Sequence, residues 1–126
     1  MDLLYFQLGG APYAIAQETI LDVTPAGPIH PVPLSPPAVL GLAERRGRAI
    51  AVIDLPSLLN DRPADARGAA HLMRLAGSLA GAALFVPAAV FSGSGTPATS
   101  GHVWIDGRLL VLLDAEALVK RAAAFN

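Results

Sequence analysis

The sequence predicts a mostly β fold, and three observations carry that prediction. Short segments rich in β-branched, aromatic and leucine residues recur along the 126 residues, separated by turns that hold glycine or proline. These segments fall into two halves, approximately residues 14–60 and 71–113. A longer helical pattern closes the chain at residues 115–124. Because a chain of this length is close to the usual size of one domain, we expect a single domain over residues 1–126.

The first half opens with a predicted hairpin. Residues 3–8 are rich in strand formers, Gly9 and Gly10 follow, and residues 13–16 alternate large and small side chains. The apolar residues of segment 17–23 have no clean period, so either a helical turn or a strand fits them. Six prolines within residues 24–37 predict an extended surface loop, because proline fixes φ and lacks an amide donor.

Two apolar segments then flank a charged one. Residues 39–42 and 49–55 predict strands, and the charged residues 44–48 between them predict an exposed turn. One helical turn fits residues 56–59, and the polar stretch 60–68, which contains a proline, predicts a break between the halves.

The second half repeats the strand and turn pattern. Strands are predicted at residues 71–75 and 82–86, with a turn at residues 76–78 between them. Residues 92–100 are glycine, serine, threonine, proline and alanine, a composition typical of a flexible loop.

The most specific local signals lie near the end of the chain. Asp106 and Gly107 separate two apolar runs and supply the positive φ angles of a tight hairpin turn. Asp114 is expected to cap the last helix, with Glu116 in its first turn, where the helix dipole favours negative charge. Two basic residues, Lys120 and Arg121, lie near its other end.

Composition excludes several classes of function. The net charge is −1 and no broad basic stripe is present, so we expect no nucleic-acid contact. The chain has no cysteine, which removes disulfides and thiolate chemistry and agrees with a cytoplasmic location. The longest apolar run, residues 79–91, contains glycine and proline and is shorter than the ~20 residues that span a bilayer, so we expect no membrane insertion.

No motif for catalysis or metal binding is evident. His30, His71 and His102 are widely separated and have no second ligand at helical spacing. Asp54 and Asp114 each follow an apolar strand and precede a helical turn, where capping is a sufficient role. We therefore expect a protein that is not an enzyme and that uses no cofactor and no metal.

The segment from Gly41 to Leu55 resembles the central motif of CheW-like domains, which reads approximately G-[VI]-x-N-L-R-G-x-[VI]-[VL]-P-[VI]-x-D-L. The matching positions are Gly41, Arg46, Gly47, Ile50, Val52, Asp54 and Leu55. The opening hairpin, the segment 20–23 and the closing strand and helix at residues 107–118 resemble the same family. The chain departs from the motif at Glu44 and Arg45, where the family has Asn and Leu, and at Ala51, where it has Pro.

The resemblance implies a CheW-like fold of two small SH3-like β-barrel subdomains around a shared core, with a C-terminal helix. The region 86–101 is shorter than is usual in the family, which implies an abbreviated second subdomain. In this respect the chain is similar to the short CheW-like proteins of complex chemosensory systems, such as the Frz system of gliding myxobacteria.

The resemblance also implies partners. CheW-like adaptors bind the cytoplasmic signalling tips of chemoreceptors and couple them to the regulatory domain of a CheA-type histidine kinase or to another CheW-like protein. If strands of the second subdomain are missing, the alternative is a receptor-binding module that does not bind the kinase. A small-ligand or enzymatic domain on a similar barrel is a third hypothesis.

Two sets of residues are singled out for partner binding and for turns. The predicted partner-binding residues are Arg46, Ile20, Leu21, Val23, Glu44 and Arg45. The predicted structural turn residues are Gly41, Gly47, Asp106 and Gly107. Arg46 could instead pack on its own barrel, and the apolar residues of the first set could simply be core. We expect Trp104 and Phe91 to be buried, with an exposed adhesive patch as the alternative.

Overall fold

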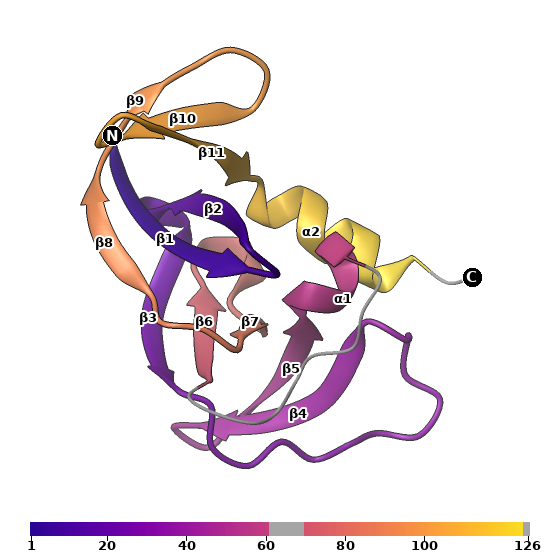
Figure 1. Ribbon diagram of the computed structural model, residues 1–126. Helices are drawn as coiled ribbons and strands as arrows, with labels where there is room; N and C mark the ends of the chain where they lie inside the picture. The colour runs from indigo at the N-terminus through magenta and orange to yellow at the C-terminus, as the bar shows by residue number, and fades with distance from the viewer. Residues whose placement is uncertain (61–69, 125–126) are drawn as a thin grey trace.

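The computed structural model describes residues 1–60 and 70–124, which form two curled sheets, two α-helices and two short 3₁₀ helices (Figure 1). The strands are β1 (Asp2–Leu8), β2 (Ala11–Ala16), β3 (Ile20–Pro25), β4 (Val39–Arg45), β5 (Arg48–Asp54), β6 (His71–Leu75), β7 (Ala82–Val86), β8 (Phe91–Ser94), β9 (Thr96–Pro97), β10 (His102–Ile105) and β11 (Arg108–Leu113). The helices are η1 (Gln17–Thr19), α1 (Leu55–Asn60), η2 (Gly77–Leu79) and α2 (Ala115–Ala123).

The first sheet has the order β3-β6-β7-β5-β4 and curls into a small barrel, called barrel 1 here. Its strands pair antiparallel except β5 and β7, which run parallel. The chain leaving β3 closes the barrel on β4, because the backbone groups of His30 and Leu42 exchange hydrogen bonds of 2.8 and 2.9 Å. The proline-rich segment predicted to be a loop is therefore fixed to β4 by backbone pairing.

The second sheet has the order β8-β1-β2-β11-β10-β9, with β2 and β11 parallel, and forms barrel 2. β8 pairs with β1 on one side, and β9 pairs with β10 on the other. Gly95 lies between β8 and β9, and its amide donates to the Met1 carbonyl oxygen at 2.9 Å. One extended segment thus joins both edges of the sheet and closes it.

The prediction of a flexible loop at residues 92–100 is wrong for most of that stretch. Its glycines permit close strand approach, since a Cβ on Gly95 would lie 2.6 Å from Leu3 Cδ1 and 2.8 Å from the Trp104 carbonyl oxygen. The open backbone edges of β1 and β10 supply hydrogen-bond partners for this segment. Composition alone did not indicate these partners, because they lie far away in the sequence.

Three apolar clusters form the core. The largest lies between the sheets and includes α1 and α2, while the other two fill the barrel interiors. The shared cluster contains Phe6, Leu8, Tyr13, Ile15, Ile53, Leu55, Leu58, Met73, Leu75, Leu84, Val86, Leu113, Ala115, Leu118 and Ala122. This arrangement confirms the predicted mostly β architecture of two barrels around a shared core with a C-terminal helix.

The local turn and cap predictions are confirmed. Asp106 and Gly107 have φ angles of 48° and 77°, as a tight hairpin turn requires. The Asp114 carboxylate accepts hydrogen bonds from the amides of Glu116 and Ala117 at 3.0 and 3.3 Å, which caps α2. The segment 17–23, which fits either a helical turn or a strand by its sequence, contains both η1 and the start of β3.

The sheets follow a different division of the chain from the approximate subdomains 14–60 and 71–113. β6 and β7 belong to barrel 1 together with β3, β4 and β5, while β1 and β2 join barrel 2. The domain limits themselves remain a prediction, and the predicted break at residues 60–68 lies almost entirely outside the described residues. Within residues 1–60 and 70–124, no helix has the length and apolar character needed to cross a membrane.

Candidate functional site

The tip of the β4–β5 hairpin, residues 44–48, is called the docking turn here. Arg45 and Arg48 are the last paired residues, and Arg46 and Gly47 between them have φ angles of 53° and 76°. Two successive left-handed residues are the pattern of a two-residue hairpin turn. The Gly47 amide donates to Glu44 Oε1 at 3.3 Å, so a side chain at the turn's base also braces it.

Arg45 connects this turn to β3. Its Nη2 donates to the carbonyl oxygens of Pro25 and Ala26 at 3.0 and 2.9 Å, and its Nε donates to Thr24 Oγ1 at 3.3 Å. A further bond of 2.9 Å runs from Nη1 to the Glu44 carbonyl oxygen. Because β3 and β4 are the outer strands of their sheet, this guanidinium spans the seam of barrel 1.

Arg46 is exposed, whereas Arg45 is half-buried. Its left-handed backbone holds it at the tip of the docking turn, and its side chain makes no hydrogen bond or ion pair with any residue that the structure describes. The planar set of donors on its guanidinium therefore faces solvent.

The three β3 residues predicted for partner binding have different environments. Ile20 and Val23 are half-buried and pack against the shared core. Leu21 is 54% exposed, because the register of β3 on β6 shifts between Ile20 and Asp22 and leaves Leu21 as the extra residue. The structure thus presents Leu21 to solvent and directs Ile20 and Val23 inward; the role of all three in binding remains a prediction.

An ion pair that the sequence did not reveal lies across β3 and β6. Arg74 donates to both carboxylate oxygens of Asp22, from Nη2 at 2.5 Å and from Nε at 3.1 and 3.2 Å. These hydrogen bonds raise the pKa of Arg74, burial opposes them, and the negative charge of Asp22 adds to the rise. The strand register brings the two side chains together, because it places Asp22 opposite Arg74.

Gly41 was predicted to serve a turn, but it lies inside β4, beside a shift in register. Its φ is 150°, and a Cβ there would collide with the carbonyl oxygen of His30 and lie 2.6 Å from the carbonyl carbon. Glycine is required because the returning chain passes directly over it. Gly47 does occupy a turn, as predicted.

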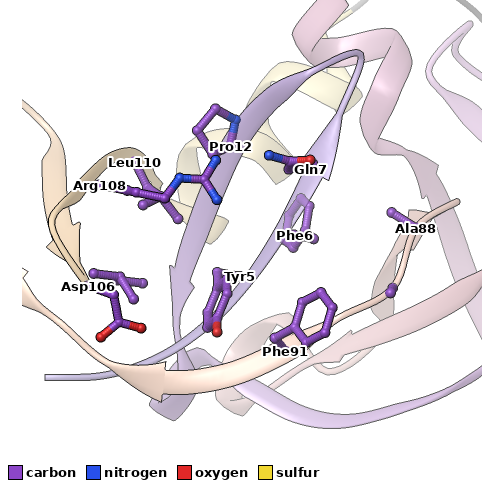
Figure 2. Close-up of a pocket in the computed structure, with 11 residues that line it drawn as sticks. Tyr5, Phe6, Gln7, Pro12, Ala88, Phe91, Asp106, Arg108 and Leu110 are labelled. Atoms are coloured by element: carbon purple, nitrogen blue, oxygen red, sulfur yellow. The ribbon is translucent and has the colours of Figure 1, made fainter.

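A cavity of about 390 Å³ opens at the mouth of barrel 2 (Figure 2). The Tyr5 and Phe91 rings stack on one side with centroids 5.5 Å apart. Asp106 and Arg108 from the β10–β11 hairpin lie at another side, as Figure 2 shows. The remaining lining residues are Phe6, Gln7, Pro12, Ala88, Ala89, Ile105 and Leu110.

The expected burial of two aromatic side chains is wrong. Phe91 is 54% exposed at the cavity, and Trp104 is 46% exposed on β10. Alternation along β10 directs Val103 and Ile105 into barrel 2 and Trp104 outward, opposite the 45% exposed Leu109. The exposure of Trp104 therefore arises from strand register within a closed barrel.

Two exposed surface features stand out in the described residues, and neither contains a metal centre. Within residues 1–60 and 70–124, no group of three or more His, Cys, Asp or Glu side chains is placed to hold a metal ion. The docking turn presents a free guanidinium on a braced hairpin, and the mouth of barrel 2 presents exposed aromatic surface.

Comparison with known proteins places these features in a family. The family model described as CheW-like domain matches residues 2–89. The crystal structure of the scaffolding protein TtCheW from Thermoanaerobacter tengcongensis is similar, with a TM-score of 0.75 at 18% sequence identity, over 93% of this chain and 86% of that chain. No curated protein matches the sequence. Because the family model covers well over half of the residues, the chain belongs to the CheW-like domain family.

Proposed function

We propose that this chain is a non-enzymatic adaptor of a bacterial chemosensory system, which binds chemoreceptor signalling tips and couples them to a CheA-type histidine kinase. The observation that carries the proposal is the docking turn: at the position of the family's motif arginine, Arg46 is exposed and presented by a braced hairpin. The CheW-like fold and family membership support an adaptor role for that surface.

The receptor contact is assigned to the docking turn together with Leu21. A chemoreceptor tip is a helical hairpin, and docking of such a hairpin combines apolar anchors with polar contacts at the rim. Arg46 supplies a planar donor group suited to carboxylates, and Leu21 supplies an exposed apolar side chain on β3, whose far end Arg45 joins to the docking turn.

The kinase contact is assigned to the mouth of barrel 2. Aromatic rings beside a cavity are common anchors of protein interfaces, and the exposed Phe91, stacked on the half-buried Tyr5, provides such a surface (Figure 2). The alternative module without kinase binding depended on missing strands in the second subdomain. The closure of barrel 2 through Gly95 favours the full adaptor, whose second partner is the kinase regulatory domain or another CheW-like protein.

Calorimetry with two separate titrants tests the proposal. The chain is titrated with a receptor signalling-tip fragment and, in a second experiment, with the kinase regulatory domain. Arg46→Ala is expected to weaken receptor binding at least tenfold and to leave kinase binding unchanged, since it removes about 1.4 kcal/mol or more at one surface. Phe91→Ala is expected to do the reverse, so each variant is the control of the other.

The outcomes separate the two candidate functions. Binding of both fragments supports the adaptor, and binding of the receptor alone supports the module that does not engage the kinase. Binding of neither fragment by the folded chain contradicts the proposal.

A further inference from the structure

We propose that Arg45 is a positioning residue, which fixes the orientation of the docking turn and thereby presents Arg46 to the partner. The inference rests on the proposed function, in which Arg46 contacts the receptor. It assigns to the neighbouring arginine a different task, which depends on contacts within the chain.

The first step is the bonding of the guanidinium. Arg45 makes four hydrogen bonds, to Thr24 Oγ1, to the carbonyl oxygens of Pro25 and Ala26, and to the carbonyl oxygen of Glu44. Bonds from a charged donor are stronger than neutral ones, and a planar fork that reaches two carbonyls at once also fixes direction. With these bonds formed, the side chain is committed to its own barrel.

The second step is the location of the acceptors. Three of the four belong to the end of β3 and the residue after it, whereas Arg45 and its fourth acceptor, the Glu44 carbonyl oxygen, lie at the end of β4. β3 and β4 are the two outer strands of the barrel 1 sheet and do not pair with each other directly. The guanidinium therefore joins the two edges at the level of the turn, while the His30–Leu42 backbone bridge joins the segment after β3 to β4 further along that strand.

The third step is the connection to Arg46. Arg45 and Arg48 form the base of the two-residue turn, and Arg46 follows Arg45 directly. A hairpin tip held only by its own strands can tilt, and ordering it upon binding lowers affinity. Arg45 removes that freedom in advance, and Glu44, which braces Gly47 from the same strand, works in the same direction.

The matched control is Arg48, the residue that pairs with Arg45 in the hairpin. Arg48 lies opposite Arg45 on β5, is exposed, and has no hydrogen bond or ion pair with the described part of the chain. Arg48→Leu therefore removes one guanidinium and one charge from the turn without touching the seam. Arg45→Leu keeps an apolar stem and removes the four bonds, and Arg45→Lys keeps the charge but loses the fork.

The first readout needs no partner. Amide hydrogen exchange at Gly47 and Arg48, followed by NMR, is expected to be about tenfold faster in Arg45→Leu and within about twofold of the parent in Arg48→Leu. Arg45→Lys is expected to lie between them. Far-UV circular dichroism and urea unfolding verify that each variant remains folded. Unchanged exchange in folded Arg45→Leu overturns the proposal.

The second readout is a double-mutant cycle on binding to the receptor signalling-tip fragment. Arg45→Leu alone is expected to weaken binding about three- to tenfold, and to have almost no further effect in the Arg46→Ala background. Equal effects in both backgrounds mean that Arg45 acts independently of Arg46, which overturns the positioning role. If the parent chain binds no receptor fragment, the proposed function fails, and hydrogen exchange still decides whether Arg45 fixes the turn.

Discussion

At the residue scale, Gly41 shows how one missing side chain permits barrel 1 to close. The backbone of His30 occupies the space that a Cβ would need, and the φ of 150° disfavours any other residue. Gly41→Ala is expected to lower the free energy of unfolding by about 3 kcal/mol, because either the His30 segment or β4 must move. Urea denaturation measures the change.

Gly81→Ala is the control for that substitution, since a Cβ at Gly81 meets nothing within 4 Å. Its effect is expected to stay within about 0.5 kcal/mol. Equal effects of the two substitutions would show that the close approach of His30 does not require glycine.

The Asp22–Arg74 pair is the second residue-scale feature with a measurable consequence. Asp22→Ala leaves the Arg74 side chain, which is only 10% exposed, without its acceptor. We expect the free energy of unfolding, measured by urea denaturation, to fall by about 2–3 kcal/mol. This is less than for a fully buried ion pair, because the Asp22 side chain is itself 34% exposed. Lys120→Ala breaks the exposed Glu116–Lys120 pair and is expected to cost less than about 0.5 kcal/mol.

The pH dependence of this pair follows from the raised pKa of Arg74. A cation whose pKa is higher in the folded state contributes stability that is fully present below its unfolded pKa and lost only as the pH rises through its folded pKa. Since the pKa of arginine in the unfolded chain already lies far above neutral pH, the contribution of Arg74 is expected to stay constant between about pH 6 and 9. Unfolding free energies of the parent and Arg74→Met across that range check this.

At the scale of single elements, α2 depends on its cap. Asp114→Ala removes the acceptor of two amide hydrogen bonds and is expected to destabilise the fold by about 1 kcal/mol, because α2 packs on the shared core through Leu118 and Ala122. Asp114→Asn retains a capping acceptor and is expected to restore most of that loss. Thermal unfolding followed by circular dichroism distinguishes the two, and equal destabilisation by both would argue against capping.

Elements with local signals were predictable from the sequence. β6 and β7 match the predicted residues 71–75 and 82–86, and the Asp106-Gly107 turn and the Asp114 cap depend on neighbours within a few positions. β8 and β9 were not predictable, because a glycine and serine segment becomes a strand only where two distant edges accept it.

The candidate site shows the same division. The motif singled out Arg46, whose binding role stays a prediction, whereas the hydrogen bonds of Arg45 depend on carbonyl groups about twenty positions earlier in the sequence. The inward direction of Ile20 and Val23 depends on a register shift that single-sequence patterns do not contain.

At the scale of the whole molecule, two closed barrels share one core and expose different surfaces. The docking turn belongs to barrel 1, and the cavity with Tyr5 and Phe91 belongs to barrel 2 (Figure 1, Figure 2). An adaptor must hold two partners at once, and surfaces on separate barrels are suited to that task because neither partner has to displace the other. We therefore expect receptor and kinase binding to be compatible.

The adaptor role is tested most directly by asking whether the chain joins the receptor and the kinase in one complex. A receptor signalling-tip fragment and the kinase regulatory domain are mixed with and without the chain, and the complexes are resolved by size-exclusion chromatography with light scattering. We expect one complex that contains all three components, which is lost with either Arg46→Ala or Phe91→Ala. Two separate binary complexes without a ternary one would contradict it, as would a ternary complex that neither substitution weakens.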